Sequence, residues 1–350
     1  MWTRLGVTFL LAAALQTPAL RPTDSGKAFL MTAFNLSAAD VASLDRGEVV
    51  SRTLEAKHRR EVATLGIIRV KTAPAVYVER LADITKFKRT EDVLQIGVFG
   101  LEPQPADVAS LHIDDGDVKL FRGCRVEDCE LRLPAEIIER ARQGIDWRAA
   151  DAPGKAAQLL RQMLVDYVAR YRQGGAAAGF EYADRKPRLN VASEFAAMIA
   201  GDPVTSAYAG RLRQHLLDYP RSSVEKVTDF VYWSKERVRG RPVISITHVA
   251  TVAAGDDSPV AYAIGSKQIY AMHYYDASLG LTLLVPDRTA PGTYIVYLNR
   301  SRIDLFDGMF GGVARRIVAS RAKGVVAEQL QRLQRVLAAD TSTEVSPRAK

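Results

Sequence analysis

The sequence predicts an α+β fold, in which a curved antiparallel sheet packs against a long C-terminal helix and a mostly helical segment is inserted mid-chain. Residues 224–298 contain short runs of β-branched and aromatic residues separated by Gly, Pro and Asp, a pattern typical of strands. After Gly311 and Gly312 the apolar residues recur mostly at the spacing of one helical face, as far as Leu337. Strands that end in one amphipathic helix favour a sheet with that helix across its concave face.

The first hundred residues are predicted to form short helices and strands after a flexible start at residues 21–34. Ser37 and Asp40 are suited to cap a first helix, which ends at Gly47. Pro74 begins a second helix, since proline is favoured in the first helical turn. Strands are predicted at residues 48–54, 61–71 and 93–99.

The middle of the chain, residues 134–220, is predicted to be mostly helical. Apolar residues keep a helical period over residues 156–171, and Gly174 and Gly175 follow where that helix ends. A further helix begins at Asp202. Strands then resume at residues 224–233, 242–251, 261–275, 279–285 and 292–298.

Composition sets the broad class of the protein. The 350 residues are 47% hydrophobic and 25% charged, which is ordinary for a globular protein and excludes wholesale disorder. The net charge of +8 arises from mixed basic and acidic residues without a nucleic-acid-binding motif, so we expect a solvated surface and no nucleic-acid partner. Since no Gly-, Pro- or Ser-rich linker divides the chain, we predict one domain over residues 35–338, an insertion at about 103–220 and a disordered tail at 339–350.

The N-terminus has the pattern of an export signal. Arg4 precedes an apolar run at residues 5–15, and small residues follow it, so residues 1–20 are predicted to be a secretory signal peptide. The run is short for a membrane span, although a retained anchor is the alternative. No Cys follows the run, which argues against a lipoprotein anchor. We therefore expect a secreted or periplasmic protein.

Two cysteines agree with an oxidising compartment. Cys124 and Cys129 are separated by four residues in a turn-like stretch, which predicts a local structural disulfide. Because the enclosed loop is short, the bond would rigidify a turn more than it stabilises the fold. A redox-active motif has two intervening residues instead of four, and no metal ligands follow nearby.

The two ends of the chain resemble the START-like, or polyketide-cyclase-like helix-grip, proteins. In GIIRVKTAPAVYVERLADITKF (residues 66–87), a strand, a small-residue–Pro turn and a helix with Tyr77 and Asp83 match the start of that superfamily. Residues 292–337 are similar to its final strand and closing helix, whereas residues 103–220 have no counterpart. The resemblance implies a cavity between sheet and helix that binds lipids, sterols or other apolar molecules; a minority of members are enzymes.

The densest group of candidate ligand-binding residues is KQIYAMHYYD at residues 267–276. On a continuous strand, Lys267, His273 and Tyr275 share one face and could fix the polar end of an apolar ligand. The alternative is a set of cross-strand aromatic pairs with a hydrogen-bonded histidine.

Four aromatic residues on other predicted strands raise the same question. Tyr232 and Trp233 point to opposite faces, as do Tyr294 and Tyr297, so at most one of each pair faces a cavity. We include all four among the candidate ligand-binding residues.

Catalytic and metal-binding signatures are absent from the sequence. It has no Gly-x-Ser-x-Gly elbow, phosphate-binding glycine loop or His-Glu-x-x-His motif. The five histidines are widely separated, so we expect no metal and no cofactor. The Arg- and Ala-rich composition is typical of bacterial proteins, so the glycosylation sequons at Asn35 and Asn299 carry no weight.

These observations favour an exported, non-enzymatic protein that holds a hydrophobic, lipid-like ligand between the sheet and the C-terminal helix. The expected partner is a lipid or other hydrophobic small molecule, and transient contact with a membrane surface is compatible with this role. One alternative is an enzyme of the same architecture with His273 or His248 as general acid–base. Another is an envelope protein–protein interaction module whose middle helices form a docking surface.

Overall fold

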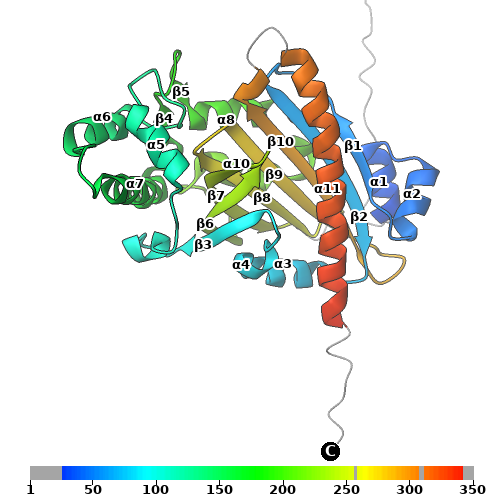
Figure 1. Cartoon of the computed structure of the whole chain (residues 1–350). Coiled ribbons are helices and arrows are strands. Elements are labelled where there is room, and N and C mark those ends of the chain that lie inside the picture. The colour runs from blue at the N-terminus through cyan, green and yellow to red at the C-terminus, as the bar shows by residue number, and fades with distance from the viewer. Residues whose placement is uncertain (1–25, 256–257, 307–310, 342–350) are drawn as a thin grey trace, which may run out of the picture.

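The computed structural model in Figure 1 describes residues 26–255, 258–306 and 311–341. The predicted signal peptide lies outside these residues. Of the predicted disordered tail at residues 339–350, residues 339–341 belong to the C-terminal helix, and the rest lies outside the described residues. The chain is α+β, as predicted, and its main sheet has eight strands, each antiparallel to its neighbours. In spatial order the strands are β1 (Val50–Leu54), β2 (Glu61–Val70), β10 (Thr293–Ile303), β9 (Tyr275–Pro286), β8 (Tyr262–Ala271), β7 (Arg241–Ala253), β6 (Val227–Val238) and β3 (Val93–Phe99).

The long C-terminal helix α11 (Gly311–Thr341) packs against the sheet at its β1–β2 end (Figure 1). Val326 and Leu330 of this helix are buried over Gly66 of β2. Short helices α3 (Pro74–Ala82) and α4 (Ile84–Phe87) belong to the same apolar cluster, so they cover the same side of the sheet. We call this the helix-facing side. The predicted closing helix is confirmed, although it lies toward one end of the sheet.

The other side of the sheet carries most of the remaining helices (Figure 1). They include α1 (Gly26–Phe34), α2 (Ala38–Asp45), α7 (Ala152–Gly174), α8 (Val191–Ala200) and α10 (Gly210–Asp218). The prediction of a flexible start at residues 21–34 is wrong where the structure describes it, because residues 26–34 form α1. Phe29 and Leu30 are fully buried against this side, and that packing holds the helix in place.

The middle segment is mostly helical, as predicted. Besides α7, α8 and α10 it contains α6 (Ala135–Gly144) and α9 (Pro203–Tyr208), with the two-residue strands β4 (Glu181–Tyr182) and β5 (Leu189–Asn190). One more helix, α5 (Asp115–Gly123), precedes this segment and was not predicted. The predicted disulfide joins Cys124 and Cys129 directly after α5. Among the described helices, none combines the length and the apolar character needed to span a bilayer.

The predicted strand at residues 261–275 is two strands in the structure. β8 ends at Ala271 and β9 begins at Tyr275, because Tyr274 has a left-handed backbone conformation with φ of 67°. The pairing of β7 with β8 also shifts register between Ile246 and Thr247. Both irregularities change which side a residue faces, since strand alternation holds only along an unbroken strand.

Candidate functional site

A strip of half-buried polar side chains crosses the middle of the sheet on its helix-facing side. The register places these residues next to one another, since Gln268 pairs with Ser278 and Ser266 pairs with Gly280. On the other flank, Asn299 also pairs with Gly280. The helix-side strip, as we call it, consists of Ser266 and Gln268 of β8, Ser278 of β9, and Tyr297 and Asn299 of β10.

Solvent reaches this strip although it lies on the three central strands. Tyr297 and Asn299 are half-buried, whereas Leu298 between them is 2% exposed and faces the other side. Gly280 lies at the centre of the strip, and a Cβ there would stand 3.1 Å from the Tyr297 hydroxyl. The strip is therefore a solvent-accessible surface of small and polar groups, and it lies beside the apolar surface that α11 covers.

Aromatic and charged side chains border the strip on the β6 flank. Lys88 Nζ lies 2.6 Å from a carboxylate oxygen of Glu236, and both side chains are partly exposed. Burial alone would raise the pKa of Glu236, but the Lys88 ammonium lowers it below its usual value, which keeps the carboxylate ionised. Burial raises the pKa of Tyr232 and of Tyr297, so both hydroxyls stay neutral. The border thus combines one ion pair with neutral aromatic groups.

The predicted ligand-binding residues divide between the two sides of the sheet. Tyr232, Tyr275 and Tyr297 lie on the helix-facing side, where burial raises the pKa of Tyr275 to about 12. Trp233 and Tyr294 belong to the apolar clusters of the other side.

Trp233 and Tyr294 also have structural partners. The indole of Trp233 donates a hydrogen bond to the Asp107 carbonyl at 2.8 Å. The hydroxyl of Tyr294 donates one to Asp287 at 3.3 Å. These two predicted ligand contacts are therefore core residues in the structure.

Lys267 and Tyr275 do not share a face, contrary to the prediction. Lys267 lies on the side opposite α11, where its Nζ donates a hydrogen bond to the Leu216 carbonyl at 2.9 Å. The same ammonium lies 4.6 Å from the centre of the Phe195 ring and 5.5 Å from that of Tyr171. Burial lowers the pKa of Lys267 to about 8.

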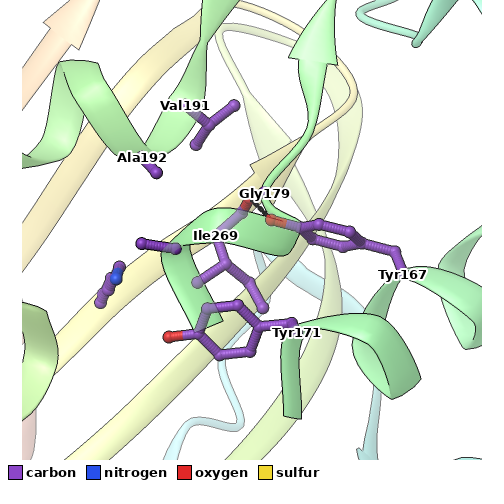
Figure 2. A pocket seen from close by; sticks show the side chains of 8 residues that line it. Tyr167, Tyr171, Gly179, Val191, Ala192 and Ile269 are labelled. Atoms are coloured by element: carbon purple, nitrogen blue, oxygen red, sulfur yellow. Dashed lines mark hydrogen bonds between the residues drawn. The ribbon is translucent and has the colours of Figure 1, made fainter. Parts of the chain in front are cut away.

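A small cavity adjoins Lys267 and Tyr171, and Figure 2 shows the side chains that line it. Tyr167 and Tyr171 of α7 extend toward it, and the Tyr167 hydroxyl donates a hydrogen bond to the Ile269 carbonyl at 2.7 Å. The cavity encloses about 10 Å³, which is room for roughly one water molecule. It is too small for a lipid.

The two candidate catalytic histidines lie in different surroundings. His273, 2% exposed, follows β8 and has its Nε2 3.1 Å from Asp117 of α5. His248 of β7 is fully buried, and its Nδ1 shares a hydrogen bond of 2.9 Å with the Tyr171 hydroxyl. Neither ring lies on the helix-facing side, so neither adjoins the helix-side strip.

His248 belongs to a cluster that the sequence did not reveal. Asp229 of β6 and His215 of α10 lie beside it, and their potential ligand atoms are all within 4.8 Å of one another. Burial alone would raise the pKa of Asp229, but the adjacent imidazoles of His215 and His248 lower it well below its usual value. The expectation of no metal site was based on sequence spacing, which does not report such contacts between separate elements.

The residues of the helix-side strip were also missed, apart from Tyr297. A signal was present, because Ser278, Gly280 and Thr282 alternate with apolar residues along β9. Alternation of this kind marks a strand with one solvated side.

Comparison with known proteins adds no relative. No family model matches the chain, and neither a curated protein nor a solved structure matches it. The resemblance to START-like proteins therefore stays a prediction, and the function is argued from the site alone.

Proposed function

We propose that the protein is exported and binds a hydrophobic, lipid-like molecule on the helix-facing side of its sheet, next to α11. The observation that carries this proposal is that solvent reaches the middle of the sheet at the helix-side strip. An ordinary core would bury the central strands on that side as well. Here Ser266, Ser278 and Asn299 keep partial exposure between α11 and the β6 flank.

The chemistry of this side suits an amphiphile. Half-buried Phe230, Tyr262 and Ile96 offer apolar surface that would gain about 25 cal/mol for each Å² removed from water. Polar groups of the helix-side strip would accept or donate hydrogen bonds to one end of the ligand. The Lys88–Glu236 ion pair lies at the border, where a charged head group would meet it.

The outer face of α11 supports transient contact with a membrane. Ile317, Val325 and Val336 are exposed, at 50%, 50% and 43%. Helical spacing places them on one face together with the basic residues Arg321 and Arg332. Apolar and basic groups on one face favour adsorption to an anionic lipid surface, from which a ligand could be collected.

Export is part of the proposal and is supported by two findings. The Cys124–Cys129 disulfide fits an oxidising compartment, and the apolar run at residues 5–15 has the pattern of a signal peptide.

The interaction-module alternative has less support. The apolar residues of α7 that were considered for docking are buried in the core, Leu160 and Val168 fully so. The acid–base alternative also has less support, because its two candidate groups, His273 and His248, do not adjoin the helix-side strip.

The proposal is tested by native mass spectrometry of the protein purified from the bacterial periplasm, followed by solvent extraction and titration with a fluorescent fatty acid. We expect a stoichiometric lipid and saturable uptake. In Ser266→Phe the new ring stands beside Gly280 at the centre of the helix-side strip, so uptake should fall at least about 10-fold, or about 1.4 kcal/mol.

Thr53→Phe is the matched control, because it places the same ring at an exposed position of the edge strand β1. Its uptake should equal that of the wild type. A wild-type protein that carries and takes up no lipid, or a Ser266→Phe variant that binds as well as Thr53→Phe, would refute the proposal.

A further inference from the structure

Three potential metal ligands from three different elements meet on the side of the sheet opposite α11. His215 Nε2 lies 3.5 Å from Asp229 Oδ2, and His248 Nε2 lies 3.6 Å from Asp229 Oδ1. Both separations exceed an ordinary hydrogen bond. They are close to the spacing of about 3.3 Å between two ligands of a tetrahedral Zn²⁺ ion bound at about 2.0–2.1 Å.

The histidine nitrogens that face this point are buried without hydrogen-bond partners. His248 is 0% exposed and His215 is 6% exposed. Within the described part of the chain, no hydrogen-bond partner satisfies Nε2 of His248 or either ring nitrogen of His215. An unsatisfied buried polar atom costs about 1–3 kcal/mol, and a bound metal ion would remove that cost for a nitrogen that ligates it.

The surroundings hold His248 in the orientation of a ligand. Its Nδ1 is engaged with the Tyr171 hydroxyl at 2.9 Å, which leaves Nε2 to face Asp229. Metal-bound histidines commonly have such a partner on the second nitrogen. The Tyr219 ring lies 4.4 Å from the His248 ring, centre to centre, and further restricts it.

We propose that His215, Asp229 and His248 bind one divalent transition-metal ion, with Zn²⁺ the ion that best suits two imidazoles and one carboxylate. Three protein ligands leave a fourth tetrahedral position open to water. The Asp229 side chain is 24% exposed, so an ion can enter from solvent on that side. Lys267, which pairs with His248 across β7 and β8, is the nearby cationic group that opposes the ion.

Zinc binding is tested by isothermal titration of the chelator-treated full-length mature protein, with metal content measured by mass spectrometry. We expect one Zn²⁺ per chain. His215→Gln removes a direct ligand, so affinity should fall by at least about 100-fold, the upper range for loss of an outer-sphere partner. His112→Gln is the matched control, because that ring is 70% exposed, and it should bind as the wild type does.

A readout on the unaltered protein keeps the test valid if His215→Gln does not fold. X-ray absorption of the Zn²⁺-loaded wild type should show two imidazole ligands, and Co²⁺ should give the visible bands of a tetrahedral site. Failure of wild-type protein to bind Zn²⁺, equal binding by His215→Gln and His112→Gln, or a spectrum without imidazole would each overturn the proposal. None of these outcomes bears on lipid binding at the helix-side strip.

Discussion

Gly66 of β2 lies directly under Leu330 of α11. A Cβ at position 66 would stand 2.6 Å from Leu330 Cδ1 and 2.4 Å from Val326 Cγ1, closer than real side chains approach. The missing side chain allows the helix to rest on the strand. Because α11 is anchored here, at the β1–β2 end, the middle of the helix-facing side stays open to solvent.

The added methyl group of Gly66→Ala should therefore displace α11 from β2. Overpacking of this kind costs about 1–3 kcal/mol, which we expect as a loss in the free energy of unfolding measured with urea. The control is Gly324→Ala on the exposed face of the same helix, where nothing lies within 4 Å of the added Cβ. That variant should gain about 0.5–1 kcal/mol, because alanine is the better helix former. A neutral Gly66→Ala would show that α11 is not seated on β2 in solution.

Asp276→Asn should be among the most destabilising single changes in the protein. The Asp276 side chain is 0% exposed and contacts the guanidinium groups of Arg60, Arg132 and Arg185, the second at 2.5 Å. Breaking a buried ion pair costs about 3–5 kcal/mol. Arg132 and Arg60 keep one carboxylate each, Asp304 at 2.9 Å and Glu194 at 3.2 Å, so we expect the lower part of that range.

The control for this change is Asp83→Asn, which removes an exposed carboxylate 2.9 Å from Lys86. An exposed pair contributes about 0–1 kcal/mol, so this variant should unfold almost as the wild type does. Equal urea midpoints for the Asp276→Asn and Asp83→Asn variants would contradict this prediction and would mean that Asp304 and Glu194 alone compensate the buried arginines.

The fold class was predictable because it depends on periodicity. The apolar runs of residues 224–298 and the helical spacing after Gly312 are local patterns, and the structure confirms the sheet and α11 that they predicted. The start of the chain was predicted less well. Residues 26–34 are too short a segment to indicate a stable helix alone, and α1 exists because Phe29 is buried against the rest of the protein.

The site was less predictable, because single backbone irregularities reverse the side that a residue faces. The left-handed conformation of Tyr274 places the side chains of Lys267 and Tyr275 on opposite sides of the sheet. Tyrosine has no preference for this conformation, so the sequence does not predict it. The His215–His248 contact depends on where α10 docks on the sheet, which sequence spacing does not contain. Only the alternation along an unbroken strand, as around Ser278 of β9, contained a usable signal for the site.

Lys267 should give the protein a stability that rises with pH. Burial lowers its pKa from 10.5 to about 8, so between these values unfolded Lys267 binds a proton that the folded residue has released. The free energy of unfolding therefore increases across this window and is lowest below it. The difference between the two pKa values corresponds to about 3 kcal/mol. Lys267→Met cannot titrate, so its stability relative to the wild type should fall by about that amount between about pH 7 and about pH 10.5.

Urea unfolding of the wild type and Lys267→Met at both pH values measures this difference directly. At neutral pH the gain from removing the buried ammonium is partly offset by the lost hydrogen bond to the Leu216 carbonyl. The methionine variant lacks this bond at both pH values. The lost bond therefore does not contribute to the change with pH in the stability difference between the variant and the wild type. Lys323→Met, at an exposed position of α11, should show no such change. If the wild type and Lys267→Met respond to pH in parallel, Lys267 is not held in the buried environment that the Phe195 and Tyr171 rings provide.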